Sequence, residues 1–364
     1  MAVSRKPVRY PDCNSNSNQD RGSMDVDRRA FLQSSGSAVL ASAALPATLL
    51  STTTKSEQDE EPAAETLVKK LYDSMSENQR ASVCFEWDHV QTFRSGMNKS
   101  GLLRTRVENN WQVTDKKIDS TFYSRDQQEI IRAIFESLYS PGWIPKIEKQ
   151  LQDDAGGYGK QQSIAIFGKP GAEKFEFVMT GRHLTLRCDG NSADHVAFGG
   201  PIFYGHAASE FDETADHPGN VFWPQAIVAN KVFEMLDGKQ RKQALVKRRP
   251  REQAVAFQGT GGRFSGIPIT ELSHDQKEQV QKVLKKLIEP YREADRAEAM
   301  QCLEDQGGLD KCSLAFYSQG DIGNDEVWDN WRLEGPSFVW YYRGSPHVHV
   351  WVNVSSDASV QTNS

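Results

Sequence analysis

The chain has 364 residues, of which 25% are charged and 38% hydrophobic, as in ordinary globular domains. Its net charge of −6 comes from mixed charges, without a basic stripe that carries interleaved aromatic residues. This pattern argues against a nucleic-acid-binding protein. Beyond the first 50 residues no apolar run approaches the roughly 20 residues of a transmembrane helix, so no stable membrane span is expected.

Residues 1–50 have the features of a disordered leader followed by an export signal. Residues 1–23 are polar and show no hydrophobic periodicity, which is typical of disorder. After Met24, the adjacent Arg28 and Arg29 precede Ala-Phe-Leu and a mildly apolar stretch from Ala38 to Leu50. This order is typical of the twin-arginine export signal, and the apolar stretch is too short for a membrane anchor.

The signal predicts a periplasmic or secreted protein that the twin-arginine translocase carries across a membrane already folded. We expect translation to start at Met24 and cleavage to follow small residues at positions 41–43 or at Ala47. Residues 51–64 are polar and predict a linker into the mature domain. The alternative is an arginine pair that precedes an amphipathic helix by chance.

Two predicted helices in the mature region have the same pattern. Ser124-Arg125-Asp126-Gln127 begins one that Pro141 ends, and 149 residues later Ser273-His274-Asp275-Gln276 begins another that Pro290 ends. Ser and Gln three residues apart form a capping box, which satisfies backbone N–H groups at a helix start. Apolar residues at helical spacing then predict one buried stripe on each helix: Ile131, Ile134, Phe135 and Leu138, and Val280, Val283, Leu284 and Leu287.

Further matching segments surround these helices. Residues 71–80 match residues 232–241, and the β-branched and aromatic runs 163–167 and 313–317 predict one strand in each half. Second strands are expected around residues 183–186 and 337–340. Matching order, spacing and caps favour a duplication over coincidence among amphipathic helices.

We therefore predict an α+β fold of internally duplicated helix-helix-strand-strand halves that share one core around a pseudo-two-fold axis. The predicted halves are residues 65–190 and 225–355. Residues 191–224 connect them, and residues 356–364 form a disordered tail.

The sequence Pro-His-Val-His-Val-Trp-Val-Asn-Val at residues 346–354 predicts a last strand. Side chains alternate along a strand, so the four valines share an apolar face. His347, His349, Trp351 and Asn353 share the other face. Two imidazoles spaced in this way can converge on one metal ion, for which histidine is the commonest ligand. The alternative is a solvated strand face.

A metal site needs at least three protein ligands, and three other histidines are candidates. His183 precedes a predicted strand of the first half, His206 follows a Gly-Gly-Pro turn, and His195 aligns with His347 in the repeat. We expect His183 as the third ligand, with His206 or His195 as a fourth ligand or as a support for a ligand ring. The site would take one transition metal, namely zinc, copper or iron. Alternatively, His183 is a core histidine, and the other two have ordinary structural roles.

Other residues leave alternatives open. Cys302 and Cys312 flank a short polar loop, so they form either a disulfide outside the cytoplasm or two half-buried thiols. Trp328, Trp331, Trp340 and Trp351 either line a ligand pocket or fill the core. Asp88 and Glu334 lie near aromatic residues, but neither identifies a general base. No nucleophile elbow, P-loop, dinucleotide fingerprint or zinc-protease helix is present.

From about Leu67 to Val354 the chain resembles the family called domain of unknown function 3500. The resembling segments are LYDSMSENQRASVCFEWD, SRDQ, IAIFGKPG, TGRHLTLR, GGPIFYGH, WRLEGPSFVWYY and PHVHVWVN. Members resemble one another in a His-Leu segment, here with His183, and in a terminal His-x-His, here His347 and His349. Many members have His-His-Leu, where this chain has Arg182 first, and many carry an acidic residue where it has Tyr341. The resemblance implies no particular activity.

Two functions follow from these features. The first is an exported metalloenzyme, hydrolytic or oxidative, because a three-histidine site with an open position activates water or oxygen. The second is a non-catalytic exported ligand-binding or cell-envelope protein, in which the histidines and tryptophans form a cleft for a small molecule.

Overall fold

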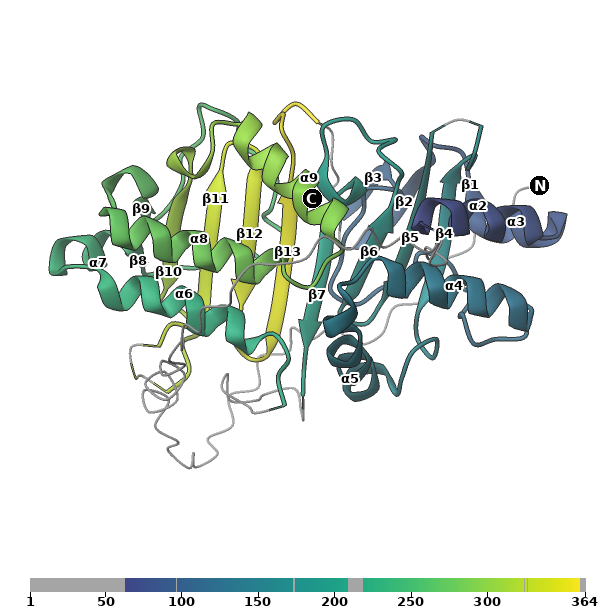
Figure 1. Cartoon of the computed structure of the whole chain (residues 1–364), viewed down its shortest axis with the longest axis horizontal. Coiled ribbons are helices and arrows are strands. Elements are labelled where there is room, and N and C mark those ends of the chain that lie inside the picture. Colours follow the sequence, from purple (N-terminus) through teal and green to yellow (C-terminus); the bar gives the residue numbers. More distant parts are fainter. Residues whose placement is uncertain are drawn as a thin grey trace, which may run out of the picture.

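The computed structural model describes residues 63–360, apart from residues 96, 173, 209–218, 324 and 326. The predicted export signal, nearly all of the predicted linker and residues 361–364 lie outside these residues. The fold is α+β, with the long helices on one face of a large sheet (Figure 1). Among the described residues, no helix is long and apolar enough to cross a membrane.

Within the described residues up to His206, the first part of the chain contributes four α-helices, with strands β1 to β3 between the second and the third, and then four consecutive strands. Its elements are α2 (Ala64–Ser74), α3 (Glu77–Val83), β1 (Cys84–Phe85), β2 (Val90–Ser95), β3 (Met97–Leu102), α4 (Arg125–Ser137), α5 (Ile144–Ala155), β4 (Ser163–Gly168), β5 (Phe175–Gly181), β6 (Leu184–Cys188) and β7 (Ile202–His206). Strands β2 and β3 form a separate two-stranded sheet.

The second part follows a similar order. Its elements are α6 (Trp223–Met235), α7 (Gly238–Ala244), β8 (Leu245–Val246), β9 (Ile267–Pro268), α8 (His274–Ile288), α9 (Glu293–Asp305), β10 (Ser313–Tyr317), β11 (Asn330–Gly335), β12 (Phe338–Arg343) and β13 (Val348–Val354). Four short 3-10 helices are also present among the described residues, at Pro141–Trp143, Ala197–Gly199, Ile269–Glu271 and Leu309–Lys311.

The main sheet has the strand order β1-β4-β5-β6-β7-β13-β12-β11-β10-β8, with β9 also paired to β10. Strands β1 and β8 lie parallel to their neighbours, and the other pairs are antiparallel. Strands β7 and β13 meet in the middle of the sheet (Figure 1).

The predicted strands at residues 163–167, 183–186, 313–317 and 337–340 lie in or overlap β4, β6, β10 and β12. The prediction of two strands after each helix pair was incomplete, because β5, β7 and β11 were missed. All three strands are buried on both faces. Strands β5 and β7 therefore lack the regular alternation of a half-exposed strand, whereas β11 alternates but buries its polar residues as well.

The two predicted capping boxes are confirmed, at Ser124 with Gln127 and at Ser273 with Gln276. Each of these glutamines also joins its helix to the first helix of the same part, α2 or α6. The side-chain amide of Gln127 donates to the carbonyl oxygen of Ser74 at 3.0 Å, and that of Gln276 donates to the carbonyl oxygen of Met235 at 2.8 Å. The helix starts therefore fix the packing of the helix layer as well as the local fold.

Both faces of the sheet are buried. One apolar cluster beneath the helices contains residues of both parts of the chain, among them Leu71, Phe135, Val232, Leu284 and Val350. Irregular segments cover the opposite face: residues 103–113 lie against β4 and β5, and Val255 lies against β12 and β13. Polar side chains of β13 that point away from the helices are therefore buried too.

The tryptophans and cysteines near the C-terminus belong mainly to the core. Trp331 and Trp340 are fully buried on the helix side of the sheet, Trp351 is fully buried on the opposite face, and Trp328 packs against the core. Cys302 and Cys312 are free thiols, and burial raises the pKa of each.

Candidate metal centre

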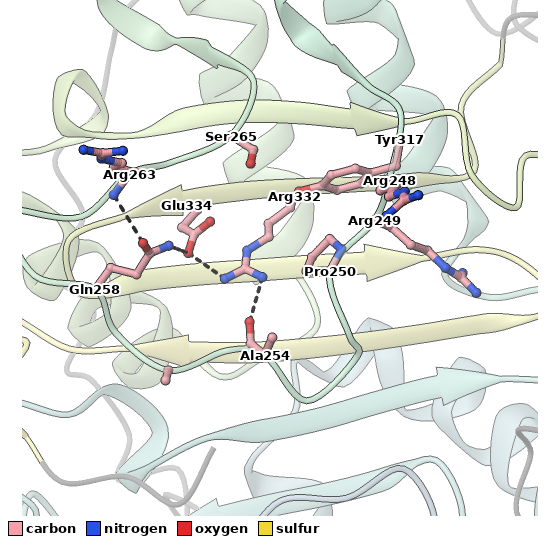
Figure 2. A pocket seen from close by; sticks show the side chains of 11 residues that line it. Arg248, Arg249, Pro250, Ala254, Gln258, Arg263, Ser265, Tyr317, Arg332 and Glu334 are labelled. Carbon is pink, nitrogen blue, oxygen red and sulfur yellow. Dashed lines mark hydrogen bonds and ion pairs between the residues drawn. The ribbon is translucent and has the colours of Figure 1, made fainter.

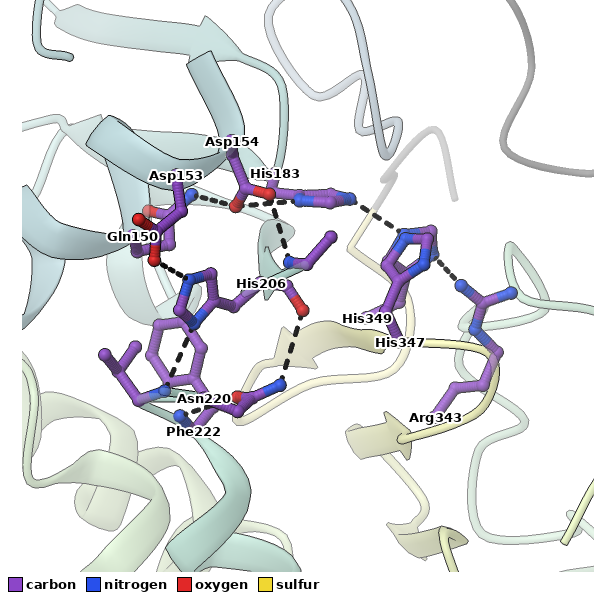
Figure 3. A network of polar contacts seen from close by, with 12 residues as sticks. Gln150, Asp153, Asp154, His183, His206, Asn220, Phe222, Arg343, His347 and His349 are labelled. Carbon is purple, nitrogen blue, oxygen red and sulfur yellow. Dashed lines mark hydrogen bonds and ion pairs between the residues drawn. The ribbon is translucent and has the colours of Figure 1, made fainter. Parts of the chain in front are cut away.

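Three histidines converge near the middle of the sheet (Figure 3). His349 belongs to β13, His347 lies just before it, and His183 lies in the turn between β5 and β6. The Nε2 atom of His349 is 3.0 Å from Nε2 of His183 and 2.9 Å from Nε2 of His347. All three side chains are buried, and their candidate ligand atoms lie within 4.8 Å of one another.

Gly205 gives the His183 ring room to reach the other two histidines. Strand β7 separates β6 from β13, and its Gly205 is the register partner of His349. A Cβ atom at position 205 would lie 3.3 Å from the His183 ring and 2.4 Å from the carbonyl oxygen of Val348. The glycine therefore lets the imidazole cross the central strand and lets β13 approach closely.

The backbone of His183 has an uncommon conformation. Its φ of 56° lies in the left-handed region, which costs a residue with a Cβ about 1–2 kcal/mol. The backbone N–H of His183 donates to the carbonyl oxygen of Asn109 at 3.0 Å, which anchors the turn. A strained backbone that points a side chain into a cluster of chemically active groups is a common feature of functional sites.

Carboxylates lie behind two of the three rings. Nδ1 of His183 is 2.9 Å from Oδ2 of Asp154 in α5, and Nδ1 of His349 is 2.8 Å from Oε2 of Glu252. The Arg343 guanidinium also contacts Nδ1 of His349 and forms an ion pair with Glu252. A carboxylate at the far nitrogen is the usual support of a metal-bound histidine, because it fixes the ring and its tautomer.

Asp154 is itself held in place by its surroundings. Its Oδ2 accepts a hydrogen bond from Gln150 at 2.8 Å, and its Oδ1 accepts one from the backbone N–H of Ala207 at 3.0 Å. Burial alone would raise the pKa of Asp154, but His183 and the hydrogen bond from Gln150 hold it below its ordinary value. The carboxylate therefore stays charged and can accept the Nδ1 proton of His183.

The Nε2 atoms of the three rings face one another. An imidazole with its proton on Nδ1 has a lone pair on Nε2, and Nδ1 of His183 and of His349 each lie beside a carboxylate oxygen. With this tautomer in both rings, the two Nε2 lone pairs face each other at 3.0 Å and a cation between them removes their repulsion, whereas a proton on either Nε2 makes the same contact a hydrogen bond. Tetrahedral ligands at zinc–nitrogen bond lengths lie about 3.3 Å apart, so small movements would accommodate an ion.

The surroundings favour a neutral imidazole at His349. Burial, the nearby Arg343 and the other two histidines lower the pKa of His349 well below its ordinary value. The neutral ring is the form that coordinates metals. The donor set, three imidazoles with carboxylates behind two of them, therefore fits a transition-metal ion.

His206 lies outside this group, so of the two roles expected for it, fourth ligand or support for a ligand ring, its contacts fit only the second. Its Nε2 is 3.0 Å from Oδ2 of Asp153, and its Nδ1 accepts a hydrogen bond from the backbone N–H of Val221 at 3.2 Å. Both ring nitrogens are therefore engaged elsewhere. Asp153 is the chain neighbour of Asp154, and Ala207 is the chain neighbour of His206. The contacts of His206 with Asp153 and of Ala207 with Asp154 therefore hold the end of α5 in place, and Asp154 at that end contacts His183.

His195 also lies apart from the three histidines, with Nδ1 3.1 Å from the hydroxyl oxygen of Ser356. Of the two acidic candidates, Glu334 pairs with Arg332 at 2.6 Å, and Asp88 lines a separate pocket of about 290 Å³.

The sequence patterns did not reveal Asp154, Glu252 and Gly205 as residues of the site. Only Gly205 carried a signal, since it immediately precedes a candidate histidine.

Comparison with family models matches residues 57–352 to the family described as protein of unknown function (DUF3500). Comparison with curated proteins and with solved structures finds no match. The matched range contains His183, His347 and His349, together with both supporting carboxylates. The chain belongs to the DUF3500 family.

Proposed function

We propose that this chain is an exported metalloprotein that holds one transition-metal ion between His183, His347 and His349. The observation that carries the proposal is the convergence of three buried Nε2 atoms, with Asp154 and Glu252 behind two of the rings. Imidazole ligands suit zinc, copper and iron alike. Three protein ligands leave a coordination position for water or a small molecule.

Metal content tests this proposal. Purified wild-type protein loaded with zinc, copper or iron should retain about one equivalent of metal after dialysis, because three imidazoles bind such ions tightly. His347→Ala and His183→Asn should retain almost none; asparagine tolerates the left-handed backbone at position 183, so the second change removes the ring at little conformational cost.

The matched control for metal content is His274→Ala, since the His274 side chain is 86% exposed. It should retain as much metal as the wild type. Equal metal in all four proteins, or none in the wild type with any of the three ions, would rule out the three-histidine site.

An enzyme and a binding protein would use this ion differently. With an open coordination position, a bound metal would supply an activated water or a site for oxygen, which supports a hydrolytic or oxidative metalloenzyme. Complete burial of the three histidines favours the alternative, a non-catalytic exported ligand-binding or cell-envelope protein. Azide added to cobalt-substituted protein separates them: a changed visible spectrum indicates a reachable coordination position, and an unchanged one indicates a closed site.

Export through the twin-arginine pathway is the second component of the proposal. It is supported by Arg28 and Arg29 before Ala-Phe-Leu and a mildly apolar stretch, residues that lie outside the described part. A reporter fused after Leu50 should reach the periplasm, and Arg28→Lys with Arg29→Lys should keep it in the cytoplasm. Undiminished export of the double variant would contradict this assignment.

We also infer that the fold arose by internal duplication around a pseudo-two-fold axis between β7 and β13. The strand order from β1 to β7 mirrors that from β8 to β13, and the glutamine contacts of α4 recur in α8. Gln127→Ala and Gln276→Ala should therefore destabilise the protein to a similar extent, by about 1–3 kcal/mol each, because each removes a capping box and the hydrogen bond that joins its helix to the first helix of the same part. Urea unfolding measures both, and a large effect of only one would contradict the equivalence.

A further inference from the structure

A pocket of about 390 Å³ lies on the sheet face opposite the helices, over the second part of the chain (Figure 2). The residues that line it come from the segment between β8 and β9 and from β10 and β11: Arg248, Arg249, Pro250, Ala254, Ala256, Gln258, Arg263, Ser265, Tyr317, Arg332 and Glu334. Its volume lies within the range of small-molecule sites.

The charge of this pocket is opposite to that of the whole chain. Four arginines face a single carboxylate, Glu334, whereas the chain carries a net charge of −6. Glu334 accepts hydrogen bonds from Arg332 at 2.6 Å and from Gln258 at 2.7 Å, so its charge is already compensated by Arg332. The other three guanidiniums make the pocket strongly positive.

Those three guanidiniums have no carboxylate partner among the described residues. Arg249 contacts only neutral oxygens, the side chain of Asn330 at 3.4 Å and the carbonyl of Ser345 at 3.1 Å. Arg248 and Arg263 form no ion pair within the described part of the chain. Arginine presents a planar fork of donors that matches carboxylate and phosphate oxygens.

Arg332 provides a second, independent sign of a ligand. It is 5% exposed and donates from its terminal nitrogens to Glu334 and to the carbonyl oxygen of Ala254 at 2.7 Å. Its Nε is buried without a hydrogen-bond partner among the described residues, and the Arg332 residue itself lines the pocket. Because leaving a charged donor unpaired is costly, such a group calls for an acceptor.

We propose that this pocket binds a small organic anion whose carboxylate or phosphate group contacts the arginines. Tyr317, Pro250 and Ala254 supply apolar surface for the rest of the molecule. This proposal rests on the positive charge of the arginines, on the Nε of Arg332 without a hydrogen-bond partner in the described part of the chain and on the pocket of about 390 Å³. It does not depend on the proposed metal site.

The pocket and the three histidines share one face of the sheet. Arg332 pairs with Tyr341 on β12, which pairs with Trp351 on β13, so Arg332 lies two strands from the strand of His349. At strand spacing this is about 10 Å. The segment that supplies Arg248 and Ala254 to the pocket also supplies Glu252 to His349, so the two sites are built on the same stretch of chain.

Calorimetric titration of the full folded chain with benzoate and, separately, with inorganic phosphate tests the proposal. Saturable binding of either ion to the wild type, weakened about tenfold or more by Arg248→Gln with Arg263→Gln, is the expected result. Benzoate binding indicates a carboxylate ligand with an apolar body, and phosphate binding alone indicates a phosphorylated one. Both changed side chains are exposed, so the double variant should fold.

Arg251→Gln is the matched control, since Arg251 is an exposed arginine of the same segment that does not line the pocket. It should bind as tightly as the wild type. The proposal is overturned if neither ion shows saturable binding, or if the double variant and Arg251→Gln bind as the wild type does. Arg332→Gln provides a further check, in which circular dichroism first establishes that the variant is folded.

Discussion

Metal added to the metal-free wild-type protein is expected to raise its free energy of unfolding. The expected gain is about 4 kcal/mol when the free metal concentration is 1,000 times the Kd of the site for that metal. The three imidazoles meet only in the folded chain, because His183 is separated by 166 residues from His349. An ion that binds only the native state stabilises it by mass action. His349→Ala should abolish this gain, since His349 lies between the other two rings at 3.0 and 2.9 Å.

Urea unfolding with zinc and with a chelator measures this difference for both proteins. His274→Ala serves as the control, because its side chain lies at the surface and should leave the metal-dependent gain intact. The account is contradicted if wild type and His349→Ala respond equally to zinc. Lower stability of a variant in the chelator alone does not contradict the metal site. The quantity compared is the difference between the unfolding free energies measured with zinc and with the chelator.

The largest expected loss of stability follows replacement of Glu176 in β5 by glutamine. Glu176 and Arg187 are fully buried, and the two Glu176 oxygens accept hydrogen bonds from Arg187 and from Arg104, each at 2.7 Å. Glutamine leaves the buried Arg187 without its counter-charge. Breaking a buried ion pair by removal of one partner costs about 3–5 kcal/mol.

Urea unfolding compares Glu176→Gln with Glu136→Gln as a matched change. Glu136 pairs with Arg132 on a helix surface, where both side chains are about a third exposed. An exposed pair of this kind contributes about 1 kcal/mol or less. Equal losses of unfolding free energy in the two variants would contradict this prediction. They would show that the buried ion pairs of Glu176 with Arg187 and Arg104 contribute no more to stability than an exposed pair.

Local patterns predicted the parts of the site that lie close together in the sequence. Alternation in the last strand placed His347 and His349 on one face, and the capping boxes placed the helix starts. His183 was less certain, because nothing in its spacing specifies a turn that carries the ring over Gly205. That contact depends on β7 lying between β6 and β13, a strand pairing that the sequence does not encode locally.

The supporting carboxylates were beyond the reach of sequence patterns. Glu252 lies 97 residues before His349 in an irregular segment, and Asp154 lies at the end of an amphipathic helix among other polar residues. For His206 the sequence left two roles open, a ligand or a support, and the fold directs its ring to Asp153 and Val221. Long-range packing decides which polar groups meet.

Anomalous diffraction from crystals of zinc-loaded protein tests the central claim most directly. Data collected on both sides of the zinc absorption edge should show one peak at about 2.0–2.1 Å from Nε2 of His183, His347 and His349. Asp154 and Glu252 should remain at the far nitrogens of two of these rings. A peak on His206, on surface carboxylates, or none between the three histidines would contradict the metal centre.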